Sequence, residues 1–104
     1  MRIWVTGAAG QIGRVLVPQL QDLGHDVFTL GRRPLSNPAI PHYHWDASDK
    51  IQFSTSLEEP DVVVHLASQT SPYLARESPS EDCVINVVGP LRLMDAVHEK
   101  GWCP

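Results

Sequence analysis

Three regularly spaced glycines follow the first apolar run of the chain, and this turn constrains the fold more than any other feature. The run is IWV at residues 3–5, and the turn reads TGAAGQIG over residues 6–13. A strand that leads through a glycine-rich turn into a helix is the context that a dinucleotide-binding site requires. Gly7 then permits the tight turn, Gly10 lets backbone amides approach a pyrophosphate, and Gly13 lets the helix pack closely on the strand.

The helix that follows this turn would supply further phosphate contacts. The amides of Gln11 and Ile12 are expected to point at the phosphates, because a helix N-terminus presents unpaired N–H groups. The alternative is that the glycines serve turn geometry alone. No Gly-Lys-Ser/Thr sequence follows the turn, which excludes a mononucleotide P-loop.

Short apolar runs alternate with segments of helical spacing along the rest of the chain. Strands are expected over residues 3–5, 27–30, 42–45 and 62–66, helices over 12–23, 49–56 and 80–100, and a polar loop over 67–79. This order predicts a parallel sheet covered by helices. We therefore expect an α/β fold, a partial Rossmann-type doubly wound parallel sheet of about four strands in the order 3-2-1-4 with flanking helices.

Four motifs lie in register along the chain. They are the turn at 6–13, Asp46 with Ala47 at the end of the third expected strand, DVVVHLAS at 61–68, and NVVG at 86–89. Together they resemble the extended short-chain dehydrogenase/reductase family, the NAD(P)-dependent epimerase/dehydratase group, over essentially all 104 residues. The resemblance implies that Asp46 and Ala47 contact the adenine of a dinucleotide. It also implies that Leu66, Ala67 and Ser68 lie along the cofactor ribose.

The end of the second strand bears on the choice of nucleotide. An NAD site has an acidic residue there for the ribose 2′-hydroxyl, but this chain has Gly31, Arg32 and Arg33. A guanidinium forms two parallel hydrogen bonds to a phosphate, so we expect Arg32 and Arg33 to bind the 2′-phosphate of NADP, and NADP to be preferred to NAD. The alternative is a solvated arginine pair that begins a loop.

No residue of the chain is assigned to a chemical step. The resemblance implies a tyrosine acid/base with a lysine four residues later, but neither Tyr43 nor Tyr73 is followed by lysine at that spacing. In the family these residues follow a fifth strand, and residues 101–104 fall where that strand would begin. We therefore expect a truncated NAD(P)-binding domain over residues 1–104, about the first third of a larger protein and not catalytically competent alone.

Charge and cysteine content exclude several other classes. The formal charge is −4, and the basic residues are scattered, which argues against nucleic-acid and membrane partners. His42 and His44 alternate on one expected strand, but without clustered ligands no metal site is expected. Two cysteines 20 residues apart, without a secretory signal, predict reduced thiols in a cytoplasmic protein.

Apolar residues predict both a core and an exposed surface that could bind another chain. Trp4, Phe28 and Trp45 are expected in the core, and His65 as a buried packing residue. In the order 3-2-1-4 the strand over 62–66 lies at a sheet edge, which is prone to pairing. The helix over 80–100 has too many apolar residues for one buried face. Self-association or a partner chain is expected on this strand and helix.

Pro90 is expected to kink the last helix, because it lacks the amide that would bond the Asn86 carbonyl.

For function we weigh an NADP(H)-binding part of an epimerase/dehydratase-type oxidoreductase against two alternatives. These are a non-catalytic NADP-sensing module and a protein-interaction module.

Overall fold

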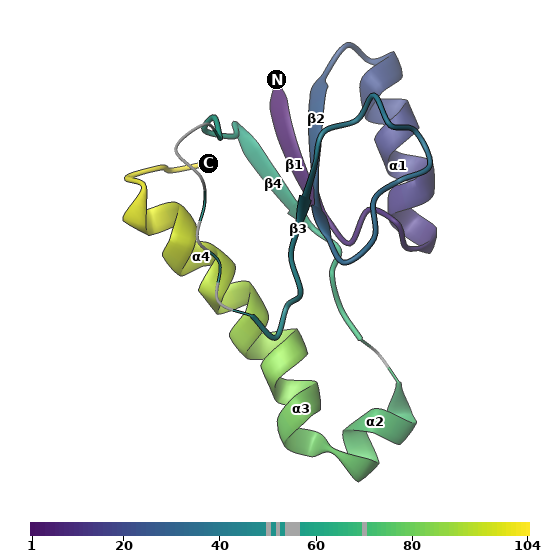
Figure 1. The fold of residues 1–104 in the computed structure, drawn as a ribbon, viewed down its shortest axis with the longest axis vertical. Coiled ribbons are helices and arrows are strands. Elements are labelled where there is room, and N and C mark those ends of the chain that lie inside the picture. The colour runs from purple at the N-terminus through teal and green to yellow at the C-terminus, as the bar shows by residue number, and fades with distance from the viewer. Residues whose placement is uncertain (50, 52, 54–56, 70) are drawn as a thin grey trace.

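Four parallel strands form one sheet in the order β3-β2-β1-β4 (Figure 1). The computed structural model describes residues 1–49, 51, 53, 57–69 and 71–104. The strands are β1 (Arg2–Thr6), β2 (Asp26–Gly31), β3 (His42–His44) and β4 (Val62–His65). Both the α/β class and the predicted strand order are confirmed.

The register places the carboxyl ends of all strands at one edge of the sheet. Trp4 of β1 lies opposite Phe28 of β2 on one side and Val63 of β4 on the other. After β1 the chain adds β2 and β3 on one side, and β4 then pairs on the opposite side of β1. This reversal is a topological switch point, the place where open α/β sheets bind ligands.

Helix α1 (Gln11–Asp22) covers one face of the sheet (Figure 1). Its buried residue Val17 packs in a cluster with Ile3, Val5 and Val27. The helix ends in a Schellman motif, in which the amide of Gly24 donates to the Gln21 carbonyl and that of the next residue donates to the Leu20 carbonyl.

The opposite face packs against α4 (Gly89–Glu99). Its cluster contains Trp4, 1% exposed, and Trp45, 3% exposed, together with Leu93 and Val97. Phe28 is partly buried against this cluster. The core positions expected for Trp4, Trp45 and Phe28 are therefore confirmed.

The expected helix over 80–100 is divided into three parts. These are α3 (Pro79–Cys83), a π-helical segment η1 (Val84–Val88), and α4. The amide of Gly89 donates to the Val84 carbonyl, five residues back. Pro90 has no amide to give the Asn86 carbonyl, so the irregularity expected near Pro90 takes the form of a π-helical turn just before it.

Residues 67–79 and 49–56 were expected to form a loop and a helix. The expected loop over 67–79 contains the helix α2 (Pro72–Glu77), whose N-cap residue Ser71 accepts a hydrogen bond from the Leu74 amide at 3.3 Å. A proline at the first helical position favours such a start, so the loop prediction was wrong there. The expected helix over 49–56 falls largely on residues outside the described part of the chain.

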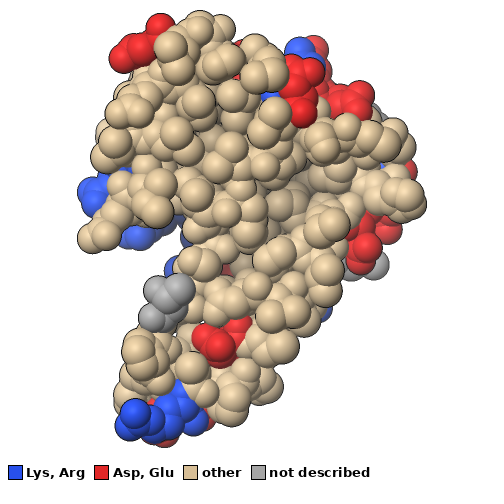
Figure 2. All heavy atoms as spheres, turned by 180° about the vertical axis from the view of Figure 1, so that it is seen from behind, with Lys and Arg blue, Asp and Glu red and all other residues tan. Residues whose placement is uncertain are grey.

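Helices α2 and α3 project from the body that contains the sheet (Figure 1), and the molecule measures 42 × 30 × 19 Å. On the face seen in Figure 2, charged side chains of either sign form small separate groups within a mostly uncharged surface. None of the helices in the described part of the chain is long and apolar enough to cross a membrane.

Candidate functional site

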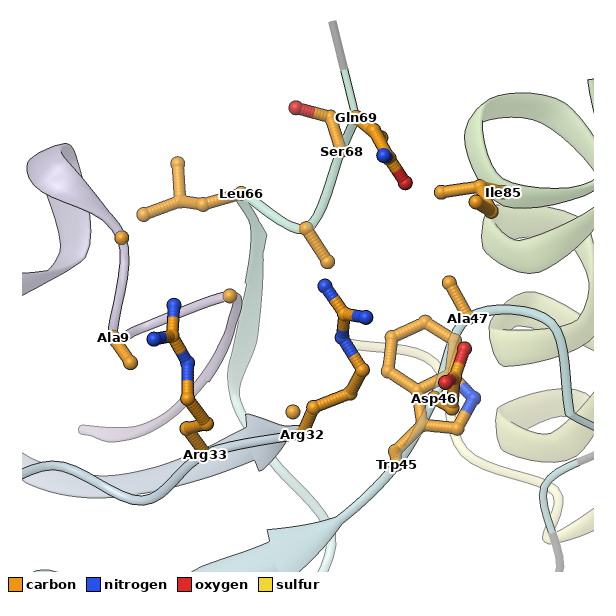
Figure 3. A pocket seen from close by; sticks show the side chains of 14 residues that line it. Ala9, Arg32, Arg33, Trp45, Asp46, Ala47, Leu66, Ser68, Gln69 and Ile85 are labelled. Atoms are coloured by element: carbon orange, nitrogen blue, oxygen red, sulfur yellow. The ribbon is translucent and has the colours of Figure 1, made fainter. Parts of the chain in front are cut away.

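A hollow of about 200 Å³ lies at the carboxyl edge of the sheet, above the switch point (Figure 3). Segments from all four strand ends meet there. Of the predicted site residues, nine line it: Gly7, Gly10, Arg32, Arg33, Asp46, Ala47, Leu66, Ala67 and Ser68. The other lining residues are Ala9, Gly31, Trp45, Gln69 and Ile85.

The glycine turn forms one wall of the hollow. Gly7 has a φ of +65°, and a Cβ on it would lie 2.7 Å from the Ala67 amide nitrogen. Its own amide donates to the Leu30 carbonyl at 3.0 Å, and the Gly10 amide donates to the Gly7 carbonyl at 3.1 Å. The turn is therefore hydrogen-bonded to β2 and packed against the segment that follows β4.

The three remaining predicted residues, Gln11, Ile12 and Gly13, do not line the hollow. Gly13 is buried, and a Cβ on it would lie 2.3 Å from the Ala8 carbonyl oxygen, as expected for a glycine that lets the helix pack closely. Gln11 and Ile12 are exposed in the first turn of α1, where backbone amides lack intrahelical acceptors.

The Thr6 side chain joins the glycine turn to the end of β4. Thr6 is fully buried, and its Oγ1 accepts hydrogen bonds from the amides of Leu66 at 3.1 Å and Ala67 at 3.2 Å. The same oxygen lies 2.8 Å from Nδ1 of His65. The first residue of the motif thus organises the segment that follows β4.

His65 is not the buried packing residue that we expected. The residue is exposed, while its Nδ1 side faces Thr6. Partial burial of the ring lowers the pKa of His65 below its usual 6.5. Because β4 lies at the edge of the sheet, its last side chain has no neighbouring strand in the described sheet to cover its outer side.

Two arginines rise from the end of β2. Figure 3 shows the Arg32 and Arg33 side chains entering the space between the glycine turn and Ser68. Both residues are exposed. The Gly31 carbonyl before them accepts hydrogen bonds from the Trp45 amide at 3.0 Å and from Nε2 of His42 at 3.1 Å. The strand end that presents the arginines is thus held by the neighbouring chain segment.

Asp46 lies on the side of the hollow formed by the end of β3. Its Oδ1 accepts hydrogen bonds from the amide and the hydroxyl of Ser48, at 3.0 and 2.8 Å. These bonds hold the pKa of Asp46 below its usual 3.8, and the positive charge of Arg32 acts in the same direction. Asp46 is therefore a carboxylate at neutral pH, an acceptor for N–H donors of a ligand.

The far wall comes from the last helical region. The Asn86 side chain accepts a hydrogen bond from the Gln69 amide at 2.8 Å and donates one to the Gln69 carbonyl at 2.6 Å. Ile85 extends into the hollow beside this clamp (Figure 3). Gly89 allows the close approach of α4, since a Cβ on it would lie 2.7 Å from the Ala47 carbonyl oxygen.

Five lining residues were not among the predicted site residues. One of them, Gly31, was noted in the sequence only because it lacks a carboxylate. Trp45 directly precedes the predicted Asp46, and Gln69 directly follows the predicted Ser68, so extending each motif by one residue finds them. Ile85 precedes the NVVG motif. Ala9 lies within the glycine turn and has a side chain without functional groups, so nothing in its chemistry singles it out.

The possible metal ligands of the described residues do not cluster, and both cysteines are free thiols. No group of three or more His, Cys, Asp or Glu side chains is placed there to hold a metal ion. His42 uses both ring nitrogens, Nε2 on the Gly31 carbonyl and Nδ1 on the Thr29 hydroxyl at 2.8 Å. Cys83 and Cys103 are both free and exposed.

The comparisons with known proteins agree with this geometry. A family model described as the NAD dependent epimerase/dehydratase family matches residues 3–102. A UDP-glucose 4-epimerase of Mycolicibacterium smegmatis is 38% identical over 97% of this chain and 36% of that protein. An L-arabinose 1-dehydrogenase (NAD(P)(+)) of Haloferax volcanii is 35% identical over 91% of this chain and 35% of that protein.

Among solved structures, the Thermus thermophilus UDP-glucose 4-epimerase complex with NAD superposes with a TM-score of 0.79 and 28% identity. The match covers 98% of this chain and 35% of that one. The chain thus spans about a third of the length of the relatives that it matches.

Proposed function

Because this chain belongs to the NAD dependent epimerase/dehydratase family, we propose that the hollow binds the adenosine and pyrophosphate of a nicotinamide dinucleotide and prefers NADP to NAD. One observation carries the proposal: the glycine turn, two arginines and a carboxylate line the same hollow, at the switch point of the sheet. This is the position at which doubly wound sheets take dinucleotides.

The pyrophosphate would lie against the glycine turn. Gly7 and Gly10 have no side chains to shield the backbone, and the amides of Gln11 and Ile12, the first two of α1, have no acceptors within the helix. Backbone N–H groups at a helix N-terminus bind phosphate without a charged side chain. The described first turn of α1 has no acidic residue that would repel the anion.

The preference for NADP is supported by the end of β2. Gly31 contributes no carboxylate, and the guanidinium groups of Arg32 and Arg33 reach into the hollow (Figure 3). A 2′-phosphate would meet two cations there, whereas the 2′-hydroxyl of NAD would find no acidic partner at this position.

Asp46 and Ala47 would contact the adenine, and Leu66, Ala67 and Ser68 would lie along the cofactor ribose. The Asp46 carboxylate, kept ionised by Ser48, is suited to accept a hydrogen bond from an exocyclic amine.

Chemistry on a sugar or other substrate would need residues besides those assigned here. Tyr43 and Tyr73 have no lysine four residues later, and a tyrosine with a pKa near 10 needs a neighbouring cation to act at neutral pH. We infer that residues 1–104 supply the nucleotide-binding part of an epimerase/dehydratase-type oxidoreductase and do not catalyse the reaction alone. A cytoplasmic location fits the free thiols of Cys83 and Cys103.

Association with a second copy or a partner chain would use β4 and α4. β4 is an edge strand, and Val62 on it is 37% exposed. On the last helical region Val87, Leu91 and Met94 are 53%, 53% and 65% exposed. They are spaced by four and three residues, so they form one apolar stripe.

A non-catalytic module that senses NADP, or one that binds a partner chain, is the second candidate. This apolar stripe favours it. The two candidates share the nucleotide site and differ in whether a reaction accompanies binding.

Calorimetric titration of the chain with NADPH and with NADH tests the proposal. We expect NADPH to bind at least tenfold more tightly, a difference of about 1.4 kcal/mol. Equal affinities would refute the NADP preference. If neither nucleotide gives binding heat, the nucleotide site is refuted and only the module that binds a partner chain remains as a candidate. Sedimentation velocity on the same sample reports self-association, and a monomer at all concentrations would refute association with a second copy.

A further inference from the structure

The hydroxyl of Thr6 connects two segments of the proposed nucleotide site. Thr6 ends β1, and the glycine turn begins at the next residue, Gly7. Leu66 and Ala67, whose amides bond the hydroxyl, follow β4 and line the same hollow. Any change in this hydroxyl therefore acts on both walls at once.

The donors around this oxygen determine where its hydrogen points. A hydroxyl has one hydrogen to donate and two lone pairs to accept with. The amides of Leu66 and Ala67 are both donors to Oγ1, although the Leu66 amide also lies 3.1 Å from the Thr6 backbone carbonyl. The hydrogen of Oγ1 is left for its third neighbour, Nδ1 of His65, at 2.8 Å. That nitrogen must then be unprotonated, with the ring proton on Nε2.

We propose that His65 is a positioning residue of the nucleotide site: unprotonated Nδ1 accepts the Thr6 hydroxyl hydrogen and thereby keeps Oγ1 directed at the amides of Leu66 and Ala67. The ligand concerned is the adenine dinucleotide of the proposed function, on which this inference rests. His65 itself lies outside the hollow's lining and acts through Thr6.

A second threonine and histidine pair in the same sheet shows why the Thr6 pair is sensitive to the protonation state of its histidine. Nε2 of His42 bonds the Gly31 carbonyl, so Nδ1 accepts from Thr29 Oγ1 at 2.8 Å. The Pro41 carbonyl, 3.4 Å from the same Oγ1, offers the hydroxyl a second acceptor. Protonated His42 can therefore donate to Oγ1 while the hydroxyl turns to Pro41.

Within the described chain the Thr6 hydroxyl has no second acceptor of this kind, because the hydrogen-bond partners of its Oγ1 there are the two amides and His65. A proton on Nδ1 would leave the hydroxyl facing donors alone. Partial burial, which lowers the pKa of His65, acts in the same direction. The other titratable side chains that line the space on the outer side of His65 are His98 of α4 and Cys103.

The first test needs no nucleotide. Long-range proton–nitrogen correlation spectra of the ¹⁵N-labelled chain at pH 7.5 report which ring nitrogen carries the proton. We expect His65 to show a bare Nδ1 and a protonated Nε2, with slow hydrogen exchange at the Ala67 amide. A ring protonated on Nδ1 would overturn the inference, whether or not the chain binds a nucleotide.

The second test uses a matched pair of variants. His65→Asn places an amide oxygen at the position of Nδ1, whereas His65→Leu keeps a branched side chain and removes the acceptor. By calorimetry with NADPH at pH 7.5 we expect His65→Leu to weaken binding about fivefold and His65→Asn to remain within about twofold of the parent. His98→Ala, on the exposed side of α4, is the control and should bind as the parent does.

The outcomes separate this inference from the proposed function. If His65→Asn and His65→Leu weaken NADPH binding equally, the packing of the ring matters and not its acceptor nitrogen. That result would overturn the inference about His65. If the parent itself binds no nucleotide, the proposed function fails, and the inference is then decided by the ring spectra and by Ala67 exchange in the two variants. Faster exchange in His65→Leu than in His65→Asn would support it, and equal rates would overturn it.

Discussion

The backbone of Ala67 lies directly against Gly7, so that a Cβ on Gly7 would come within 2.7 Å of the Ala67 amide nitrogen and 2.8 Å of its Cα. Gly7 also has a φ of +65°, a conformation that side chains with a Cβ disfavour. Glycine is needed here for two separate reasons, and the contact joins the turn after β1 to the segment after β4.

We expect Gly7→Ala to lower the free energy of unfolding by more than about 2 kcal/mol. The left-handed conformation alone costs about 1–2 kcal/mol for a residue with a Cβ, and the overlap with Ala67 requires the two segments to separate. Urea denaturation followed by circular dichroism measures this loss. NADPH binding should be lost as well, since both segments line the hollow.

Gly24→Ala is the matched control for this substitution. Gly24 has a φ of +87° at the end of α1, but a Cβ on it would meet nothing within 4 Å. Its loss of stability should therefore stay at about 1–2 kcal/mol, with NADPH affinity unchanged. Equal losses at Gly7 and Gly24 would show that the contact with Ala67 is unimportant.

The sheet and the glycine turn were predictable because they depend on local sequence patterns. A short apolar run such as IWV at 3–5, followed by glycines at a fixed spacing, has few alternatives to a buried strand and a tight turn. The parallel order then follows from the intervening helical segments. For the same reason, segments that end neighbouring strands could be assigned to one site before their geometry was known.

Features that depend on contacts across the chain were not predictable in this way. The division of the last helix reflects the missing amide of Pro90 together with the approach of Gly89 to Ala47, and only the first is visible in sequence. His65 was expected to be a buried packing residue because it lies in the strand motif at 61–68, but the edge position of β4 leaves it exposed. The Asn86 clamp on Gln69 likewise joins residues 17 apart.

Nucleotide preference should reverse when an acid is placed at the end of β2. A Cβ on Gly31 would have the Gly7 amide nitrogen at 3.7 Å as its nearest neighbour, so a side chain fits. Gly31→Asp would offset one of the two positive charges of the arginine pair and offer a carboxylate to a ribose 2′-hydroxyl. We expect NADPH affinity to fall at least tenfold and NADH affinity to rise, both measured by calorimetry.

Gly31→Asn provides the control for charge, because it has nearly the same shape as aspartate. It should weaken NADPH binding much less than Gly31→Asp does. If both variants weaken NADPH equally, the effect is steric, and the assignment of Arg32 and Arg33 to a 2′-phosphate fails.

Stability should decrease in mild acid because of two histidines. Burial lowers the pKa of both His42 and His65 below the usual 6.5 in the folded chain. The unfolded chain therefore binds more protons as the pH falls through 6.5, so the contribution of the neutral rings is complete above that pH and is lost progressively below it. The urea midpoint should be lower at pH 5.5 than at pH 7.5.

A double variant, His42→Asn with His65→Asn, should show a smaller change in the urea midpoint between these two pH values. The pKa of Asp46 is also lowered, but from 3.8, so its contribution is lost only in stronger acid. An unchanged pH dependence in the double variant would assign the effect to other groups.

Asn86→Asp tests the clamp that holds Gln69 to the last helical region. The amide nitrogen of Asn86 donates to the Gln69 carbonyl at 2.6 Å and to Oδ1 of Asp82 at 3.1 Å. Aspartate keeps the acceptor for the Gln69 amide but loses both donated bonds and sets two carboxylates side by side. We expect a loss of about 2 kcal/mol in urea denaturation. Adding Asp82→Asn should recover only part of it, because the Gln69 carbonyl stays unpaired. Full recovery would show that charge repulsion alone was responsible and that the bond to Gln69 contributes nothing.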